Sequence, residues 1–193
     1  MTKIYALCDF ETLQRRNISL KQFLQICTKY EISYIQYRDK ISSIEIQKEN
    51  LKYLTKNTTI PIIINDKLEL IEFASGMHMG QDDLKDIKTN IFKISDNELF
   101  FKFLKKKYPS KIFGLSTHNE LEILESNKLP LDYIGLGAYR KTSTKDVSNI
   151  LGDNISYLAK MSKHPVGAIG GVRKSDEIQH ITYNVIGSDL YED

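Results

Sequence analysis

The chain has 193 residues, enough for one domain with a sizeable core. Its 41% hydrophobic and 27% charged residues are ordinary for a soluble globular protein. The formal net charge of +2 provides no bulk field that would favour nucleic acid or a membrane surface, so we expect neither partner.

The two cysteines and the N-terminus indicate a compartment. Cys8 and Cys27 each fall within an apolar pattern, which is typical of buried thiols in a reducing cytosol rather than of a disulfide pair. The first residues contain neither a long apolar stretch nor a cleavage site, and no window approaches the length of a membrane span. We therefore expect a cytoplasmic protein.

Short apolar runs that predict buried strands recur along the whole chain. They lie at residues 4–7, 34–40, 60–65, 77–79, 112–116, 133–137, 165–169 and 183–186. Helical patterns separate most of these runs. Segments beginning at residues 19, 42, 95 and 117 open with Ser or Thr followed three residues later by Glu or Gln, the signature of a capping box.

Three helices are predicted in more detail, and one of them is the segment that opens at Ser95. A short one spans residues 68–74. In the helix that opens at Ser95, we expect Leu99, Phe103 and Leu104 to face inward, with lysines 105–107 at its end, where cations suit the helix dipole. Apolar residues mark the helix that follows the sixth strand, at Val147, Ile150, Leu151, Ile155 and Leu158.

The regular alternation of strand and helix predicts the fold. No shift in composition marks a linker, so residues 1–193 are interpreted as a single domain. Eight strands with helical crossovers pair in parallel, and their number favours a closed (β/α)8 TIM barrel over an open α/β sheet, which stays the alternative. The chain is short for such a barrel, and its final helix is reduced or absent. A second subunit could cover the exposed surface, which makes a homodimer possible.

Polar residues collect where the predicted strands end. In a (β/α)8 barrel the active site is built at these carboxyl ends, and glycine amides there form a phosphate cradle. Groups suited to phosphate or metal follow strands two to eight: Arg38, Lys40, Asn65, Asp66, Asp83, Ser116, Thr142, Thr144, Lys145, Gly170-Gly171 and Gly187-Ser188.

Two acidic residues among these predict a metal site. Asp66 follows the third strand and Asp83 follows the fourth, and in a parallel sheet such strand tips lie side by side. Two carboxylates that leave room for water and phosphate are typical ligands of Mg²⁺. The alternative is that Asn65-Asp66 caps a helix and Asp82-Asp83 is a solvated turn.

The inventory of groups suggests two bound anions. Arg38, Lys40 and Lys145, together with a cation on the carboxylates, suit a diphosphate, whereas the hydroxyls and glycine amides of strands six to eight suit a monophosphate. Ser116 and His118 are nearly adjacent at a helix start, so we do not expect them to form a nucleophilic dyad. A metal and cations without a nucleophile indicate departure of a diphosphate leaving group through charge stabilisation.

Several short motifs, in this order, resemble those of the thiamine phosphate synthase family. They are Gln36-Tyr-Arg38-Asp-Lys40, Ile64-Asn65-Asp66, Met77-His78-Met79-Gly80-Gln81-Asp82-Asp83, Gly114-Leu-Ser116-Thr-His118, Asp132-Tyr-Ile-Gly-Leu-Gly137, Thr142-Ser-Thr144-Lys145 and Ala168-Ile-Gly-Gly171. The resemblance implies a transferase of thiamine biosynthesis that joins hydroxymethylpyrimidine diphosphate to thiazole phosphate with Mg²⁺ and releases pyrophosphate.

The resemblance also implies roles for individual residues. Asp66 and Asp83 would bind Mg²⁺, and the catalytic charge would come from Arg38, Lys40, Ser116 and Lys145. The pyrimidine diphosphate would be held by Gln36, Arg38, Lys40, Asn65, Ser116 and Lys145. The thiazole phosphate would be held by Thr142, Thr144, Gly171 and Ser188.

The sequence departs from the family at Ala138, where a proline is usual, and in its reduced length. In its reduced length alone the chain resembles the sister family of thiazole tautomerases, which usually has a catalytic histidine at the position of Ala138 and often lacks the two carboxylates. Here the histidine is missing and both carboxylates are present, so the chemistry favours the synthase. A tautomerase-like protein and a non-catalytic phosphate-binding paralogue are therefore the alternatives. Of the histidines, His78 is predicted to be a hydrogen-bonded core residue and His118 a helix-start residue.

Overall fold

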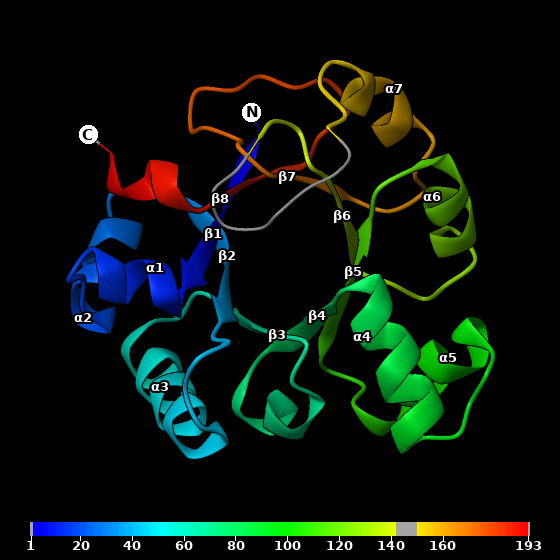
Figure 1. Cartoon of the computed structure of the whole chain (residues 1–193), viewed down its shortest axis with the longest axis horizontal. Helices are drawn as coiled ribbons and strands as arrows, with labels where there is room; N and C mark the ends of the chain where they lie inside the picture. The colour runs from blue at the N-terminus through cyan, green and yellow to red at the C-terminus, as the bar shows by residue number, and fades with distance from the viewer. Residues whose placement is uncertain (1, 142–149, 193) are drawn as a thin grey trace.

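Eight parallel strands form a closed barrel in the computed structural model, which describes residues 2–141 and 150–192. Each strand pairs with the next along the chain, and β8 closes the ring against β1. This topology confirms the predicted (β/α)8 barrel (Figure 1). The strands are β1 (Lys3–Asp9), β2 (Ile32–Arg38), β3 (Ile62–Asn65), β4 (Gly76–Met79), β5 (Ile112–Thr117), β6 (Tyr133–Gly137), β7 (Val166–Ile169) and β8 (Tyr183–Ile186).

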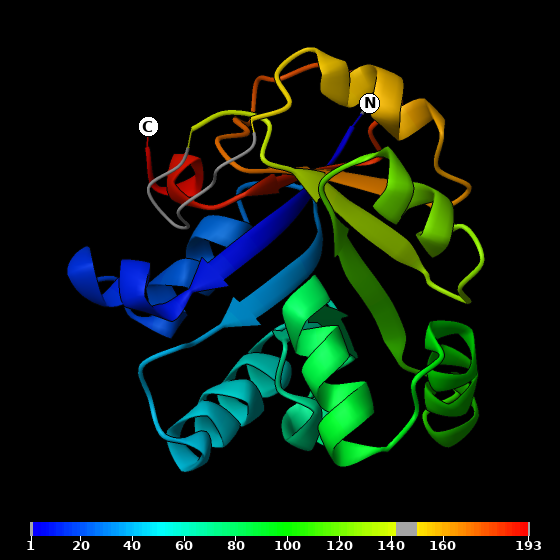
Figure 2. The same ribbon diagram turned by 45° about the vertical axis from the view of Figure 1, so that its right-hand side comes forward.

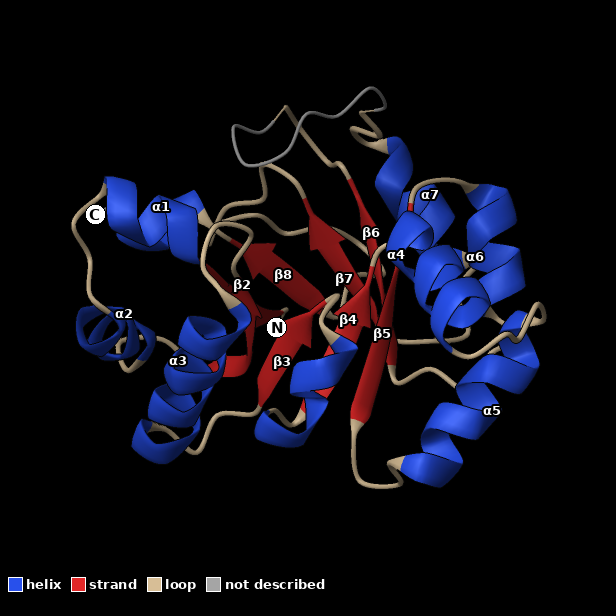
Figure 3. Ribbon diagram, turned by 60° about the horizontal axis from the view of Figure 1, so that its bottom comes forward, coloured by secondary structure: helices blue, strands red, loops and turns tan. Residues whose placement is uncertain are grey.

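Helices surround the strands on the outside of the barrel (Figures 2 and 3). The β3–β4 connection holds only a 3-10 helix, and the described β7–β8 connection holds none. The helices are α1 (Phe10–Arg15), α2 (Leu20–Cys27), α3 (Ile44–Asn57), η1 (Leu68–Phe73), α4 (Gln81–Asp86), η2 (Ile87–Ile91), α5 (Asn97–Lys107), α6 (Glu120–Ser126), α7 (Asn154–Lys160) and η3 (Ser188–Tyr191). Of these, α1, α4 and η2 were not predicted from the sequence.

The last helix is reduced to the single 3-10 turn η3, as the sequence predicts. This turn lies beside α1 at the C-terminal end (Figures 1 and 3). Its Leu190 is buried, the ring of Tyr191 packs 6.4 Å from that of Phe23, and Arg16 lies 5.5 Å above the Tyr191 ring. The turn therefore covers part of the surface that a full helix would cover in a longer barrel.

Tyrosines fill the inside of the barrel. Tyr5, Tyr34, Tyr133 and Tyr183 form one layer in which ring centroids lie 5.4–6.4 Å apart. The Tyr133 ring fits into this layer only beside a glycine at position 114, because a Cβ added at Gly114 would lie 2.2 Å from the Tyr133 Cζ atom. The tyrosine layer closes the barrel below the carboxyl ends of the strands and gives those ends a rigid floor.

Several helices begin at a different residue from the one predicted. Ser19 does form a capping box with Gln22, but Ser43 caps α3, Asp96 caps α5 and Asn119 caps α6. At α6 the reason is clear. Thr117 still belongs to β5, where its hydroxyl donates to the Gly135 carbonyl at 3.0 Å, so Asn119 accepts from the Glu122 amide instead.

The buried face of α5 also differs from the prediction. Leu104 is buried as expected, but Leu99 is 61% exposed and Phe103 is 36% exposed, while Phe100 and Phe101 are fully buried. Because the helix begins at Asn97, Leu99 lies in its solvent-facing first turn. The sequence of α5 contains more than one set of apolar residues with helical spacing. Packing against the barrel determines which set is buried.

The predicted helix after the sixth strand is shorter than expected. It begins only at Asn154, with Ile155 and Leu158 buried as predicted, whereas Ile150 is 51% exposed. Val147 lies outside the described residues. Within the described part of the chain, no helix combines the length and apolar character that crossing a membrane requires.

Candidate active site

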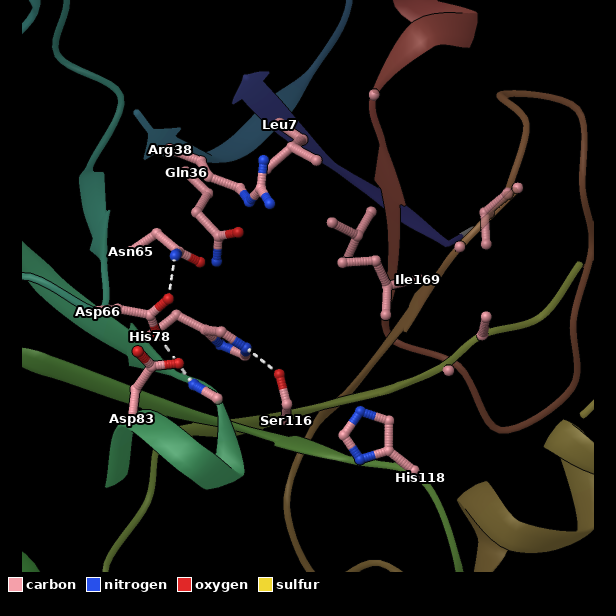
Figure 4. A pocket seen from close by; sticks show the side chains of 18 of the residues that line it. Leu7, Gln36, Arg38, Asn65, Asp66, His78, Asp83, Ser116, His118 and Ile169 are labelled. Atoms are coloured by element: carbon pink, nitrogen blue, oxygen red, sulfur yellow. Dashed lines mark hydrogen bonds between the residues drawn. The ribbon is translucent and has the colours of Figure 1, made fainter. Parts of the chain in front are cut away.

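A pocket opens at the carboxyl ends of the barrel strands (Figure 4). Every predicted site residue within the described ranges lines it, whereas Thr142, Thr144 and Lys145 lie outside the described residues. The predicted residues that line it are Gln36, Arg38, Lys40, Asn65, Asp66, Asp83, Ser116, Gly171 and Ser188.

Asp66 and Asp83 face one small space. The Gly80 amide donates to Asp66 Oδ1 at 3.0 Å, and a Cβ added at Gly80 would lie 2.8 Å from Asp83 Oδ2 and 4.0 Å from Asp66 Oδ1. Asp83 reaches this space from the first turn of α4, which begins after Gly80, rather than from the tip of β4 as predicted. The bare Gly80 backbone thus leaves room between two carboxylates.

The surroundings of Asp66 disfavour the charged form of its carboxyl group. Burial raises the pKa of Asp66, and the Asp83 charge raises it further against the hydrogen bond from the Gly80 amide, which lowers it. The charge of Lys40 also lowers the pKa of Asp66, which places this cation close by. Two hard oxygen ligands with mutual repulsion fit a divalent cation such as Mg²⁺.

The remaining ligands of such an ion would not come from further acidic, histidine or cysteine side chains. No group of three or more such residues that could hold a metal occurs in residues 2–141 and 150–192. Mg²⁺ commonly binds through one or two carboxylates and completes its shell with water and substrate phosphates. The pair therefore suits an ion that arrives with a phosphorylated substrate.

Arg38 is held by Asp9, a residue that the sequence analysis does not include among the site residues. Its guanidinium forms an ion pair with Asp9, a residue that is 4% exposed. The other Asp9 oxygen accepts from the Thr12 amide at 2.9 Å and so caps α1. Asp9 thereby fixes the direction in which Arg38 enters the pocket. Its place at the end of β1, in register with Arg38, is the signal that could have revealed it.

The histidines of the pocket have different partners from each other. His78 Nε2 lies 2.9 Å from Ser116 Oγ, and its Nδ1 lies 3.0 Å from the Tyr133 hydroxyl. His78 is thus buried and hydrogen-bonded, in accord with its prediction, but it also lines the pocket. His118 Nδ1 lies 2.9 Å from Glu122, which agrees with the expectation that Ser116 and His118 form no dyad.

The backbone of Gly170 and Gly171 lines another part of the pocket. Gly170 and Gly171 adopt φ values of +86° and +65°, which L side chains rarely reach. A Cβ at Gly170 would lie 2.6 Å from Ala138 Cβ, and one at Gly171 would lie 2.8 Å from Arg140 Cβ. The turn after β7 therefore packs directly on the segment after β6, in a form that only glycine allows.

An ion pair holds these two segments together, and the sequence interpretation missed it. Arg140 donates to the Gly171 carbonyl at 3.1 Å and to both carboxylate oxygens of Asp176, at 2.6 and 3.0 Å. Asp176 also accepts from the Arg173 amide at 2.7 Å. The bidentate pair anchors the glycine turn at the rim of the pocket. The sequence holds no local signal for it, because the partners are 36 residues apart.

Apolar side chains line the pocket between the charged side and the glycine turn. Leu7, Ile169, Val172 and Val185 come from β1, the β7 region and β8. They provide a wall that favours flat organic rings over water. The pocket thus combines a side lined by charged and polar side chains, an apolar wall and a backbone turn.

The sequence as a whole matches known proteins. A model described as thiamine monophosphate synthase matches residues 4–187. This chain belongs to the thiamine monophosphate synthase family. It is similar to the thiamine-phosphate synthase of Picrophilus torridus, with 31% identity over 162 residues that cover 81% of this chain and 72% of that protein. It is also similar to that of Persephonella marina, with 32% identity over 183 residues, 90% of this chain and 78% of that protein.

A solved structure of the family supports the fold. The thiamine phosphate pyrophosphorylase from Pyrococcus furiosus superposes with a TM-score of 0.69, covering 96% of this chain and 85% of that chain at 21% identity. The family's barrel therefore extends over nearly the whole of this sequence, including the strands that build the pocket.

Proposed function

We propose that this chain joins hydroxymethylpyrimidine diphosphate to thiazole phosphate in the pocket at the carboxyl ends of its strands, and that it releases pyrophosphate. Family membership and relatives named thiamine-phosphate synthase make it a transferase of thiamine biosynthesis. The observation that carries the assignment of the site is the pair of carboxylates, Asp66 and Asp83, that face each other across Gly80 beside Lys40.

Asp66 and Asp83 are the proposed ligands of Mg²⁺. Their oxygens leave positions for water and for diphosphate oxygens, as this ion prefers. When bound, Mg²⁺ supplies positive charge that stabilises the departing pyrophosphate. Gly80 contributes to the same site by its small size and by its amide, which fixes one Asp66 oxygen at 3.0 Å.

The chain's own residues act on the diphosphate by charge and orientation. Arg38, held by Asp9, and Lys40 both line the pocket and would neutralise the phosphate oxygens, and Ser116 would donate a hydrogen bond. In the reaction, the bond between the pyrimidine methylene carbon and the pyrophosphate oxygen breaks, and the oxygen keeps the electron pair. The thiazole nitrogen then donates its lone pair to that carbon. No protein nucleophile is needed.

The thiazole phosphate is assigned to the backbone side. The Gly171 turn and Ser188 line that side and offer amide and hydroxyl donors to a monophosphate. Thr142, Thr144 and Lys145 remain predicted partners of the two phosphates. The apolar wall would hold the two rings against each other and exclude water from the reacting carbon.

A pyrophosphate-release assay tests this function. The purified chain, both substrates and Mg²⁺ should release pyrophosphate and form thiamine phosphate in equal amounts, and omission of either substrate should abolish release. Conversion of the thiazole phosphate without the pyrimidine would instead indicate a tautomerase-like protein. Tight binding of thiazole phosphate without any turnover would indicate a non-catalytic paralogue. The homodimer and the cytoplasmic location stay predictions.

A further inference from the structure

A chain of hydrogen bonds crosses the barrel directly below the pocket. Gln36 Nε2 donates to the Tyr5 hydroxyl at 3.3 Å, and that hydroxyl lies 2.8 Å from the Tyr133 hydroxyl. Tyr133 lies 3.0 Å from His78 Nδ1, and His78 Nε2 lies 2.9 Å from Ser116 Oγ. The two end residues, Gln36 and Ser116, line the pocket, and the three middle ones are at most 5% exposed.

These hydrogen bonds connect two separate pocket residues, Gln36 and Ser116, through the barrel interior. The members of this hydrogen-bond chain come from β2, β1, β6, β4 and β5, so no two successive members share a strand. Figure 4 shows Gln36 and Ser116 apart from each other in the pocket, with His78 reaching towards Ser116. A polar network that is buried among tyrosines in this way is rigid only when each donor finds an acceptor.

One order of donors and acceptors along these hydrogen bonds gives every donor an acceptor. Because the Gln36 amide donates to the Tyr5 oxygen, the Tyr5 hydroxyl donates to the Tyr133 oxygen. The Tyr133 hydroxyl in turn donates to His78 Nδ1. A neutral histidine carries one N–H, which then lies on Nε2 and donates to Ser116 Oγ. The Ser116 proton is left to donate into the pocket.

The opposite direction leaves a donor without an acceptor in the chain. If His78 Nδ1 donated to Tyr133, Tyr133 would donate to Tyr5, whose oxygen already accepts from Gln36. The Tyr5 proton would then have no acceptor in the chain, and an unmade buried hydrogen bond is costly. Burial raises the pKa of Tyr5 and of Tyr133, so both hydroxyls keep their protons.

We infer that Tyr5, Tyr133 and His78 are positioning residues that set the direction of these hydrogen bonds. As a result, Ser116 acts as a hydrogen-bond donor and Gln36 presents its carbonyl oxygen to the pocket. The inference rests on the proposed function, in which Ser116 faces the diphosphate. A donor aimed at an anionic oxygen strengthens binding, whereas a serine oxygen aimed at the same atom would weaken it.

The packing around His78 keeps its ring in this orientation. The ring stacks on Tyr133 with centroids 5.5 Å apart and an interplanar angle of 22°. On the neighbouring strand, a Cβ added at Gly135 would lie 3.1 Å from His78 Cε1 and 3.5 Å from Nε2. Gly135→Ala would therefore press on the His78 ring, which would have to shift by a few tenths of an ångström, without removing any member of the hydrogen-bond chain.

The central test replaces one hydroxyl in the middle of the chain. Tyr133→Phe lets His78 adopt either tautomer, so Ser116 loses its fixed role. We expect kcat/KM for the pyrimidine diphosphate to fall about 10-fold, equivalent to about 1.4 kcal/mol, with the KM for thiazole phosphate unchanged. The matched control is Tyr183→Phe, which removes a hydroxyl from the same tyrosine layer outside the chain and should leave both values unchanged. Gly135→Ala should reproduce the Tyr133→Phe effect.

A double-mutant cycle separates positioning from a general packing effect. If Tyr133 acts through Ser116, Tyr133→Phe should cost less than about 2-fold in a Ser116→Ala background, because coupled residues are not additive. An unchanged 10-fold cost in that background would overturn the inference. Thermal unfolding should show one cooperative transition for both Tyr133→Phe and Tyr183→Phe, with the lower melting temperature for Tyr133→Phe, because Tyr5 and His78 each lose one buried hydrogen bond in that variant.

Binding of inorganic pyrophosphate with Mg²⁺, measured by calorimetry, distinguishes this inference from the proposed function. A wild-type chain that binds pyrophosphate but does not turn over, with weaker binding in Tyr133→Phe only, would refute the proposed function and support the inference. Equal affinity and turnover in Tyr133→Phe and Tyr183→Phe would overturn the inference. A wild-type chain that binds no pyrophosphate would also overturn it.

Discussion

The two sides of the pocket are lined by different kinds of groups. On the β2–β5 side, charged and polar side chains are held by one another, as Arg38 is by Asp9 and Ser116 is by His78. On the β6–β8 side, the lining consists of the Gly170-Gly171 turn and of apolar side chains such as Ile169, Val172 and Val185. From this difference we expect side-chain charge to matter most on the first side and backbone shape to matter most on the second. Substitutions on each side should therefore affect different substrates.

The largest effect is expected at the carboxylate pair. Asp66→Asn or Asp83→Asn should lower kcat/KM for the diphosphate substrate by about 100-fold or more, because the charge that would hold Mg²⁺ is lost. Steady-state pyrophosphate release measures this. Asp82→Asn is the matched control, because Asp82 lies beside Asp83 in the first turn of α4, is exposed and does not line the pocket. An Asp83→Asn variant as active as Asp82→Asn would contradict the metal assignment.

Arg38 should show the next largest effect on the same side. Arg38→Gln removes a charged donor to phosphate worth about 2 kcal/mol, roughly 30-fold in kcat/KM for the diphosphate substrate. The KM for thiazole phosphate should stay within about 2-fold under the same assay. Arg15→Gln, a charge-matched change on α1 outside the pocket, should leave both unchanged. Equal losses for both substrates in Arg38→Gln would refute the division into two sides.

The glycine side should respond to added volume rather than to lost charge. Gly171→Ala places a Cβ 2.8 Å from Arg140 Cβ at a φ of +65°, so we expect the KM for thiazole phosphate to rise about 10-fold. Gly152→Ala is the control, because Gly152 has a φ of +52° but nothing within 4 Å of the added Cβ. It should cost about 1 kcal/mol of unfolding free energy in urea and leave both KM values unchanged. A Gly171→Ala variant with an unchanged KM would contradict this side of the account.

The smallest effect is expected at the ion pair behind the glycine turn. Asp176→Asn should cost about 1 kcal/mol or less in unfolding free energy, because the Arg140 side chain is 43% exposed and water screens the pair. The KM for thiazole phosphate should rise about 3-fold, since the turn loses its anchor, and the diphosphate KM should not change. A larger effect on the diphosphate KM would show that the two sides are not independent.

The same ion pair predicts a pH dependence of stability. Burial alone would raise the pKa of Asp176, but hydrogen bonds from Arg140 and the Arg173 amide prevail and hold the pKa below its usual value. Its stabilisation is therefore complete above the unfolded pKa of about 3.9 and is lost as the pH falls through the lower folded pKa. The difference in unfolding free energy between wild type and Asp176→Asn should shrink between about pH 5 and pH 2. A constant difference would argue against the pair.

Features that depend on local sequence were mostly predicted correctly, and features that depend on contacts between distant residues were not. The strands and their polar ends follow from local patterns, so the barrel and the facing of Asp66 and Asp83 were accessible from the sequence. The position of Asp83 within α4 was not, because Gly80 lacks a capping side chain that would announce the helix. The links His78–Tyr133–Tyr5 join strands far apart in sequence, and only the register of the closed barrel brings them together. The inward face of α5 depends on tertiary contact in the same way.

The central claim is that Asp66 and Asp83 share one divalent ion with a phosphorylated ligand. Electron paramagnetic resonance of Mn²⁺, a spectroscopic substitute for Mg²⁺, tests it directly when the ion is titrated into the protein with pyrophosphate present. The account predicts one bound Mn²⁺ per chain in wild type and in Asp82→Asn, and none in Asp66→Asn or Asp83→Asn. Equal Mn²⁺ binding by all four proteins would contradict it.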